Sequence, residues 1–533
     1  MKNKLKLKAK TYVITAFFFA LSSTAFSSLN NNDFPKNLPE KQLEPNNLKD
    51  FEYPFENKNM FFGLTLLKGA KEYILAQELD ISWVSLQPHV LWFDIEEEPG
   101  KYNWSELDKE IKELQALHLD VTMVVSPIIN AFGEKREQVK ERILEIQEER
   151  NYDSFAAAFI AFLRDYKGAT EYDLFPNNET MPLLINFIKA AATRYDGDGK
   201  DDMPGLEYAV RNWHIIEEFP TPEMDVKLYV KILKKTSKAI KKIDKEAKVI
   251  IPGLAGNYSR IFAFVDGFID DEDGGVWKSI KYTREKLADS AFVKKEKKNY
   301  EYILRKCKKY FDIVDIHLYE EKETFMEGKL GWLKSKMNKY GYSKPIWVIE
   351  GGGPFKKPAV DTSNHGDWYF GEWTAKENAE FVVKLLVMSA ANGVTRQRWG
   401  LSGTSETGYW RGPWLVMGLT THNLEKKPSF YTYKQMREEL RDFKKVREFS
   451  YENIKLYQFK VKNKMVYVAW SKDGNTHVVD LRQIAPIGVT DLKVKYIVIK
   501  LNKNNKPVYR KDKIMPSSAV KISETPIFFE KVN

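Results

Sequence analysis

Eight short apolar runs recur along the chain between Met60 and Leu401, with amphipathic segments between them. Near-continuous apolar strands that alternate with helices predict a parallel sheet covered on both faces, in the α/β class. Eight such units suit a closed (β/α)8 TIM barrel. The runs are Phe61–Leu64, Ile81–Gln87, Val121–Pro127, Val210–Ile216, Val249–Pro252, Ile313–Tyr319, Ile346–Glu350 and Val394–Leu401. The amphipathic segments include Ser105–Leu117, Val226–Ile243, Tyr300–Tyr310 and Lys376–Asn392.

The chain has 533 residues, which is too long for one ordinary core and indicates at least two domains. We expect the barrel to occupy residues 59–428, with a long insertion from Asn130 to Glu207 after the third strand. Residues 429–533 are expected to form the last helix, Ser429–Phe443, and a small antiparallel β-sandwich. Its expected strands are Ile454–Val461, Met465–Trp470, His477–Leu481, Val494–Leu501 and Val520–Phe529.

The amino-terminal residues 1–27 have the pattern of a secretory signal peptide. Five lysines precede an apolar stretch from Tyr12 to Leu21, and Ala25-Phe26-Ser27 offers a small-residue cleavage site. Residues 28–58 are polar and read as a linker or a surface-laid extension. An exported chain whose only cysteine is Cys307 contains no intrachain disulfide. We therefore expect a periplasmic or extracellular protein, and this cysteine usage favours a bacterial source.

Charge and hydropathy exclude two classes of partner. The net charge is +10, of which the signal peptide contributes five. The remaining positive charge lies in mixed runs such as Lys234–Lys248 and Lys294–Lys309, which are typical of solvated helix faces and do not indicate a nucleic-acid groove. No run is long enough to span a membrane, so we expect no membrane insertion after signal removal. The abundance of aromatic residues fits packing and also carbohydrate binding, because a sugar presents a flat C–H face to a ring.

Two glutamates close two of the predicted strands. Glu218 ends the run Asn212-Trp213-His214-Ile215-Ile216-Glu217-Glu218, and Glu350 ends Pro345-Ile346-Trp347-Val348-Ile349-Glu350. In a parallel barrel, side chains at the carboxyl ends of the strands form the active-site face. Two carboxylates on different strands can flank one glycosidic bond, one as proton donor and the other as nucleophile.

These motifs resemble those of clan A glycoside hydrolases, the retaining (β/α)8-barrel glycosidases such as families 5, 39 and 42. Many of these end strand 4 with Trp-x-Ile-x-Asn-Glu-Pro and strand 7 with the nucleophile glutamate. The stretches Trp213–Pro220 and Pro345–Glu350 match those two motifs, and the resemblance covers the chain from about Met60 onward. Supporting matches are Glu98-Pro99-Gly100-Lys101-Tyr102-Asn103-Trp104, Asp312-Ile313-Val314-Asp315-Ile316-His317-Leu318-Tyr319, Trp399 and the closing segment Val520–Glu530.

The resemblance implies that Glu218 is the acid/base and Glu350 the nucleophile, with their carboxyl groups about 5–5.5 Å apart. The expected reaction is double-displacement hydrolysis of a β-linked oligo- or polysaccharide. Two departures leave an alternative open. Glu217 stands where the clan usually has asparagine, and Ser85 occupies the strand-2 segment where the clan commonly has arginine. The competing hypothesis is a carbohydrate-binding protein on a glycosidase-like barrel with impaired catalysis.

The residues expected to bind the substrate lie near the same strand ends. His317 and Tyr319 alternate on strand 6 and so share one face, and the tyrosine could donate a hydrogen bond to the nucleophile. The position of Trp399 suits a stacking platform, although packing is the alternative for each aromatic residue. Arg396 or Arg398 could pair with an acid inside the barrel. The full set of expected substrate-binding residues is Trp213, Glu217, His317, Tyr319, Trp399 and Trp92.

No cofactor is expected, and one segment is a weak candidate for structural calcium. Asp196, Asp198 and Asp202 lie in Asp196-Gly197-Asp198-Gly199-Lys200-Asp201-Asp202, which places oxygen ligands at alternate positions. The spacing of an EF-hand is incomplete, so a solvated turn is the favoured reading. The seven histidines are scattered without a zinc pattern, and we expect no catalytic metal.

Overall fold

The fold was analysed in a computed structural model of the chain. The predicted signal peptide and most of the predicted linker lie outside the residues that it describes. The described residues are 50–52, 60–66, 70–86, 90–127, 132, 136–149, 158, 162, 175–216, 218–219, 225–254, 256–270, 276–277, 280–281, 283–320, 322–353, 374–401, 417–421, 423–485 and 487–532.

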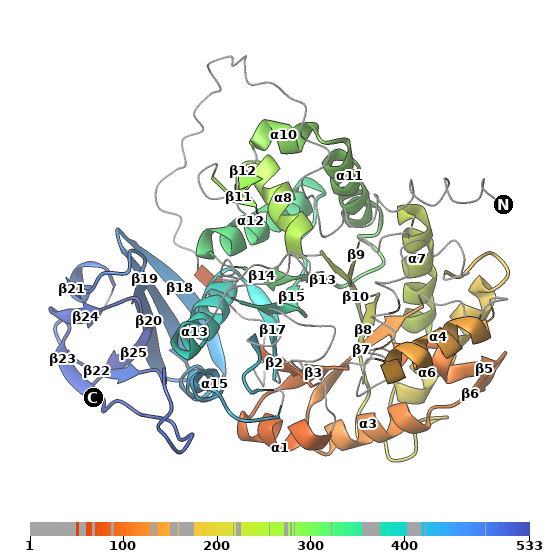
Figure 1. Ribbon diagram of the computed structural model, residues 1–533, viewed down its shortest axis with the longest axis horizontal. Helices are drawn as coiled ribbons and strands as arrows, with labels where there is room; N and C mark the ends of the chain where they lie inside the picture. The colour runs from red at the N-terminus through yellow and green to blue at the C-terminus, as the bar shows by residue number, and fades with distance from the viewer. Residues whose placement is uncertain are drawn as a thin grey trace, which may run out of the picture.

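Eight parallel strands close into a barrel, as the sequence predicts (Figure 1). Closure is complete because β13 pairs with β15 on one side and with β10 on the other. Two short strands extend the wall at its top, β4 (Val90–Leu91) beside β7 and β9 (Glu218–Phe219) beside β10. The barrel strands are β2 (Phe62–Thr65), β3 (Trp83–Ser85), β7 (Asp120–Ser126), β8 (Asn212–Ile215), β10 (Lys248–Leu254), β13 (Ile313–Ile316), β15 (Ile346–Val348) and β17 (Val394–Gly400).

Helices cover the outside of the barrel, and several begin at side-chain caps. The Asp225 carboxylate accepts a hydrogen bond from the Lys227 backbone N–H at the start of α7, and Thr374 forms a capping box with Glu377 at the start of α13. The insertion after the third strand carries α4 (Arg136–Glu149) and α6 (Met181–Tyr195), as expected. The covering helices are α1 (Ala70–Glu78), α3 (Ser105–Gln115), α6 (Met181–Tyr195), α7 (Val226–Ile243), α8 (Gly256–Val265), α11 (Ala291–Lys306), α12 (Glu323–Lys339) and α13 (Ala375–Ala391).

Shorter elements complete the barrel domain. Helices α2 (Trp92–Ile95) and α10 (Arg284–Asp289) lie in connections, and α4 spans Arg136–Glu149. Three two-stranded ribbons are β5 (Glu96–Glu98) with β6 (Lys101–Tyr102), β11 (Val276–Trp277) with β12 (Ile280–Lys281), and β14 (Leu318–Tyr319) with β16 (Gly351–Gly352). Among the described helices, none is both long enough and apolar enough to cross a membrane.

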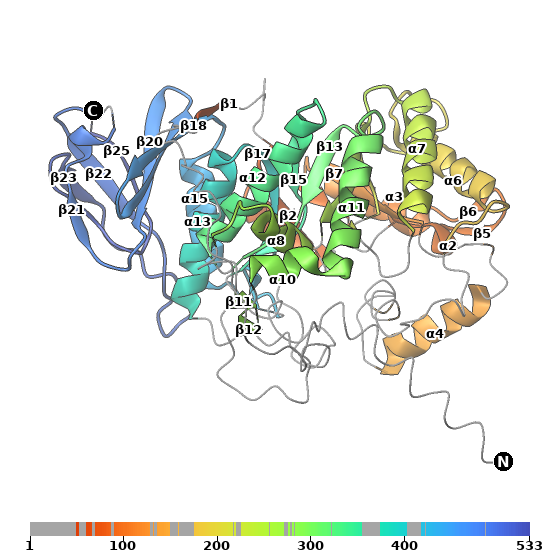
Figure 2. The same ribbon diagram turned by 90° about the horizontal axis from the view of Figure 1, so that it is seen from above.

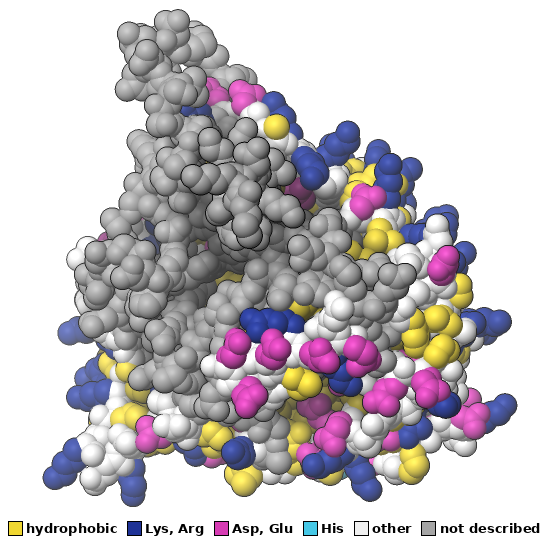
Figure 3. Space-filling view, turned by 45° about the vertical axis from the view of Figure 1, so that its right-hand side comes forward, with side chains coloured by type: hydrophobic (Ala, Val, Ile, Leu, Met, Phe, Trp, Pro, Cys, Tyr) yellow, Lys and Arg dark blue, Asp and Glu magenta, His cyan; other side chains and the backbone are white. Residues whose placement is uncertain are grey.

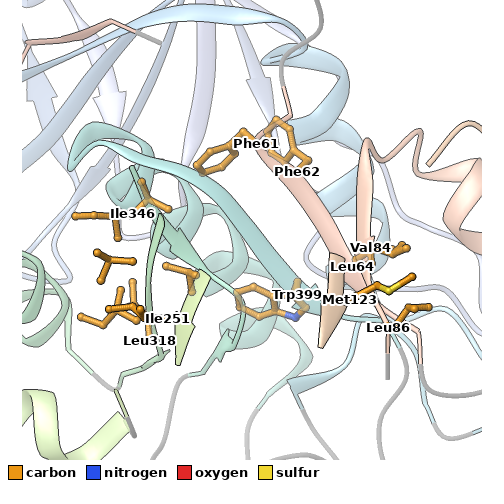
Figure 4. Packing of buried hydrophobic residues seen from close by; sticks show 14 of the residues in the cluster. Phe61, Phe62, Leu64, Val84, Leu86, Met123, Ile251, Leu318, Ile346 and Trp399 are labelled. Atoms are coloured by element: carbon orange, nitrogen blue, oxygen red, sulfur yellow. The ribbon is translucent and has the colours of Figure 1, made fainter. Parts of the chain in front are cut away.

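The strand register decides which side chains face the barrel interior. Residues paired across parallel strands point to the same face, and neighbours along a strand alternate. An inner cluster of Trp83, Ile250, Ile313, Trp347 and Ile349 fills the space between the strands. The opposite faces of the strands pack under the helices in the large core, of which Figure 4 shows fourteen residues.

The carboxyl-terminal region forms an antiparallel sheet of seven strands in the order β1-β18-β19-β20-β25-β22-β23, with the pair β21–β24 beside it. Figure 2 shows this unit at one end of the molecule, next to α13 and α15 (Pro428–Glu439). Its strands are β1 (Asp50–Glu52), β18 (Phe443–Tyr451), β19 (Ile454–Val461), β20 (Lys464–Ser471), β21 (His477–Val479), β22 (Asp491–Tyr496), β23 (Lys513–Pro516), β24 (Val520–Ile522) and β25 (Ile527–Lys531).

Several strand expectations for this region were wrong. Residues 50–52, expected in the linker, pair with β18 as an edge strand, and β18 itself and β23 were missed. The segment expected as strand 494–501 is paired with β25 only as far as Tyr496, and Leu501 forms an isolated bridge with Pro507. The residues between them pack on α15, where Thr432 Oγ1 donates to the Val498 carbonyl at 2.6 Å. A bend at Glu524 and Thr525 splits the expected last strand into β24 and β25.

Polar contacts join the sheet domain to the barrel. The indole N–H of Trp470 on β20 donates to Glu323 Oε1 at 2.8 Å, at the start of α12. The Tyr433 hydroxyl on α15 donates to the carbonyl of Gly63 on β2 at 3.2 Å. The single cysteine, Cys307, is fully buried at the end of α11.

Candidate functional site

Glu350 lies at the carboxyl end of β15, where the Tyr319 hydroxyl donates a hydrogen bond to its carboxylate. The distance from the hydroxyl to Glu350 Oε2 is 2.9 Å. The ribbon β14–β16 fixes both residues, because Leu318 N donates to the Glu350 carbonyl at 2.9 Å and Tyr319 pairs with Gly352. The Glu350 side chain keeps 17% of its surface exposed, so a ligand can reach it.

Buried polar side chains from β13, from His317 just after it and from β8 support this carboxylate. His317 Nδ1 lies 3.4 Å from Glu350 Oε2, and His317 Nε2 lies 3.3 Å from Asp315 Oδ2. The other Asp315 oxygen, Oδ1, accepts the backbone N–H of Ile349 at 2.9 Å. His214 Nε2 from β8 lies 3.7 Å from Asp315 Oδ2. Asp315 and both histidine side chains are fully buried, so this arrangement holds the imidazole of His317 between two carboxylates.

For Glu218, the structure describes the backbone. Its Cα pairs with Gly253 of β10, and a Cβ placed on Gly253 would lie 2.0 Å from His317 Nε2 and 2.7 Å from Asp315 Oδ2. Neighbouring strands are about 4.8 Å apart. The path from the Glu218 backbone to the Glu350 carboxylate therefore crosses one glycine and one imidazole ring.

The chain just before Glu218 is irregular. His214 pairs with Ile250 and Glu218 with Gly253, so β8 and β9 contain one residue more than β10 over the same stretch. Ile216 lies within that bulge with φ of 68°, an unfavourable conformation for a β-branched residue. Bulges and strained residues often re-aim side chains at functional sites. The strain at Ile216 is therefore an independent sign that the backbone is adjusted here.

A buried ion pair supports β13 and β14 from the helix layer. Lys329 on α12 is fully buried, contacts the carboxylate of Glu320 through its ammonium group, and donates to the His317 carbonyl at 2.7 Å. Removing one partner of such a pair is costly, since an uncompensated charge is left in the interior. The pair holds the backbone on both sides of Tyr319.

Arginines of β17 reach into the barrel at two levels. Arg396 Nη1 lies 2.5 Å from Asp120 Oδ2 at the start of β7, which confirms that one of these arginines pairs with an acid. Arg398, 4% exposed, donates from Nη1 to the Ser85 hydroxyl on β3. A guanidinium therefore lies beside the strand-2 serine although that strand supplies none.

The three expected tryptophans lie away from this group. Trp213 and Trp399 are each 1% exposed and share the outward-facing rows of β8 and β17, since Trp213 pairs with Met123 and Trp399 with Leu64. Figure 4 shows Trp399 within the packed cluster, and its indole N–H donates to the Met417 carbonyl at 2.8 Å.

Trp92 is fully buried and donates to Glu96 Oε2 at 2.6 Å. Glu217 lies outside the described residues. Of the expected substrate-binding residues, His317 and Tyr319 are the two that lie beside Glu350. The sequence reading missed Gly253, Asp315 and Lys329 as neighbours of this site, and only Asp315 carried a signal, through its alternation with His317 and Tyr319.

Among the described residues, one group has the donor set of a metal site. The carboxylates of Asp196, Asp198 and Asp202 have oxygens within 4.8 Å of one another. Asp202 already accepts the backbone N–H groups of Gly197 and Gly199 at 3.1 and 2.7 Å. Burial and the two neighbouring carboxylates raise the pKa of Asp196. A solvated turn stays the prediction for this segment, with structural calcium as its alternative.

Comparison with known proteins finds similarity only in structure. No family model matches the chain, and no curated protein matches its sequence. A family 39 glycoside hydrolase from the gut symbiont Bacteroides cellulosilyticus WH2 has a TM-score of 0.55 and 13% identity, over 89% of this chain and 81% of that one. A glucosidase from Croceicoccus marinus has a TM-score of 0.52 and 10% identity, over 90% of this chain and 98% of that one.

An α-L-arabinofuranosidase from Thermotoga maritima has a TM-score of 0.51 and 9% identity, over 90% of this chain and 98% of that one. At such low identity these similarities show the fold alone. The fold is the parallel barrel followed by a β-sandwich, which the family 39 structure shares. The expected resemblance to clan A glycoside hydrolases is thereby confirmed at the level of the fold.

Proposed function

We propose that this protein is an exported retaining glycoside hydrolase that cleaves a β-linked oligo- or polysaccharide by double displacement. The observation that carries the proposal is the hydrogen bond from the Tyr319 hydroxyl to the Glu350 carboxylate at the carboxyl end of β15. It lies within a barrel fold that glycosidases share. Function must be argued from the site, because one fold hosts many chemistries.

In the first step, a Glu350 oxygen bonds to the anomeric carbon while the bond to the leaving oxygen breaks, and Glu218 gives that oxygen its proton. In the second step, Glu218 takes a proton from water, the water oxygen attacks the same carbon, and Glu350 departs as a carboxylate. The Tyr319 hydroxyl orients the attacking carboxylate, since its hydrogen bond to Oε2 leaves the other oxygen to form the glycosyl bond.

The buried residues under Glu350 are suited to keep that carboxylate in one place. His317 contacts both Glu350 and Asp315. The backbone N–H of Ile349 donates a hydrogen bond to Asp315, and that of Leu318 donates to the Glu350 carbonyl, so the backbone around Glu350 is held in place. A nucleophile fixed in this way loses little orientational freedom when it attacks. His317 and Asp315 are therefore proposed as positioning residues.

The proposal is tested with a panel of 2-fluoroglycosides, which trap the nucleophile of a retaining enzyme. We expect one sugar to add its mass to the protein and peptide mapping to place it on Glu350, with no adduct on Glu350→Gln. Glu218→Ala should lose turnover of natural substrate and recover activity on an activated aryl glycoside when azide is added, giving the glycosyl azide of retained configuration. An adduct on another residue, or full activity of either variant, refutes the assignment.

The competing function is glycan binding without cleavage. It is favoured by Glu217 in the position where the clan usually has asparagine. Ser85 on β3 supports glycan binding without cleavage less strongly, because the guanidinium of Arg398 from β17 lies beside it. A binding protein would be retarded by glycan in affinity electrophoresis. It would release no product on long incubation and form no covalent adduct with any 2-fluoroglycoside.

A further inference from the structure

Positive charge is concentrated on three neighbouring helices of the barrel wall. Helix α7 carries seven lysines and no acidic residue, α11 six basic and two acidic residues, and α12 four lysines and two acidic residues. Their net charge of +13 exceeds the +10 of the whole chain, so the rest of the molecule is slightly acidic. Helix α11 packs between the other two (Figure 2). Figure 3 shows that acidic side chains gather low in the centre of one face, whereas many basic side chains lie at the right and along the margins.

An open groove of about 780 Å³ runs between α11 and α12, and we name it the α11–α12 groove. Six basic side chains, two acids and three aromatic rings line it. The basic residues on α11 extend from Lys294 to Arg305, a length of about 16 Å along the helix. The groove lies on the outer wall of the barrel, apart from the residues around Glu350.

Both acids of the groove are used within its floor. Asp266 pairs with Lys336 at 2.8 Å and with Lys297, and it accepts the indole N–H of Trp332 at 2.8 Å. Glu301 pairs with the same Lys336 at 2.7 Å. Lys336 is only 8% exposed, so the floor is a closed network with little charge to offer.

The rim of the groove is different, because its cations are exposed. Among the residues that the structure describes, no carboxylate lies within ion-pair distance of Lys298, Arg305 or Lys339. Between these cations lie Tyr302, half-buried, and Phe268, which is 38% exposed. Exposed cations interleaved with ring faces, above a neutral floor, complement a chain that carries anionic groups on flat apolar rings.

We propose that the α11–α12 groove docks an anionic stretch of polysaccharide, one bearing sulfate or carboxylate groups, at a second site outside the barrel. The inference rests on the proposed function in one respect, namely that a glycan is the polymer the protein meets. The groove would hold the polymer on the wall of the barrel and raise its local concentration at the catalytic end, as linked binding sites do. The effect is expected on the KM for anionic polymers, while short neutral glycosides should be unaffected.

The test uses Glu350→Gln protein, so that binding is measured without hydrolysis. The groove variant Lys298→Glu/Arg305→Glu/Lys339→Glu is compared with a control, Lys71→Glu/Lys109→Glu/Lys189→Glu, which makes the same charge change on α1, α3 and α6. Affinity is measured for chondroitin sulfate, neutral dextran, single-stranded DNA and phosphatidylglycerol vesicles in 50 and 300 mM NaCl.

We expect the groove variant to bind chondroitin sulfate roughly 30-fold more weakly, since three rim contacts become repulsive, and the control to change less than about threefold. Dextran should bind neither protein, and binding of the sulfated polymer should weaken with salt. Equal loss in both variants, no binding of chondroitin sulfate by the parent, or tighter groove-dependent binding of DNA or vesicles overturns the proposal. If groove binding fails while the 2-fluoroglycoside still labels Glu350 of the unsubstituted protein, the groove proposal alone is refuted. If that labelling fails while the Glu350→Gln protein still binds through the groove, the proposed hydrolase alone is refuted.

Discussion

Replacing Gly253 by alanine tests the packing on which the candidate site depends. The added Cβ would lie 2.0 Å from Nε2 and 2.2 Å from Cδ2 of His317. Carbon and nitrogen atoms in ordinary contact are about 3.5 Å apart. The imidazole must therefore move by more than ~1 Å, and it is already held between Asp315 and Glu350. Overpacking of this kind typically costs about 1–3 kcal/mol of unfolding free energy.

The same displacement should reach the chemistry. A shift of ~1 Å in a positioning group lowers the rate by about 100-fold. We therefore expect Gly253→Ala to unfold at lower denaturant concentration and to react with the trapping 2-fluoroglycoside about 100-fold more slowly. The matched control is Gly331→Ala on α12, where the nearest neighbour of the new Cβ is an exposed Phe268 side chain at 3.2 Å. That change should be neutral or slightly stabilising, because alanine favours a helix over glycine.

A double-mutant cycle separates this contact from a general effect on β10. In a His317→Ala background the ring is gone, so Gly253→Ala should lose at least ~1 kcal/mol of its destabilising effect. The reasoning is refuted if the alanine costs the same in both backgrounds. It is refuted equally if Gly253→Ala has the stability and labelling rate of the parent protein.

Four further predictions concern single groups. Tyr319→Phe should slow trapping by about 10- to 100-fold without changing the denaturation midpoint, since it removes only a hydrogen bond to the nucleophile; an unchanged rate contradicts this. Lys329→Met should cost about 3–5 kcal/mol in urea unfolding, and Lys329→Met/Glu320→Leu should recover most of that cost, because both members of the buried ion pair are then removed; an equally unstable double variant contradicts this.

Burial, with repulsion from nearby glutamates, raises the pKa of Glu110 to about 7. The protonated Glu110 side chain contributes its full stability below the unfolded pKa of 4.5, and this stability is lost as the pH rises through 7. Glu110→Gln should therefore raise the melting temperature at pH 8 and leave it unchanged at pH 4. Equal shifts at both pH values contradict this. EDTA should change the melting temperature by less than ~1 °C, because Asp202 already folds its turn through two backbone N–H groups; a larger drop would identify a structural cation.

The barrel was readable from sequence because its signal is local and repeated. Seven of the eight strands lie within the predicted runs or within one residue of them, β10 extends two residues past its run to Leu254, and α7 spans the predicted residues. Apolar strands buried on both faces differ in composition from the amphipathic helices between them, so each element identifies itself. The small sheet was harder, since β23 contains Lys513 and ends at Pro516, a composition that disfavours strand assignment but is tolerated at a sheet edge.

The residues of the candidate site also differ in whether the sequence could predict them. The alternation of His317 and Tyr319, and their approach to a glutamate on the next strand, follow from the period of two along one strand. Gly253 and Lys329 could not be found in that way, because their importance comes from contacts made by other elements. A glycine acquires its role from the ring that fills the space of its missing side chain, and a lysine on a helix acquires its role from the carbonyl beneath it.

The tryptophans show how much depends on a single residue step. Trp213 lies between Asn212 and His214, whose side chains face inward, and Trp399 follows Arg398 in the same relation. A one-residue step along a strand reverses the face, so an aromatic residue within a barrel strand has even odds of packing under the helices. A sugar platform in such a fold is better sought after the strand ends, where a turn can re-aim a side chain. Tyr319 meets that condition, since it lies in the β14–β16 ribbon above β13 and already contacts Glu350.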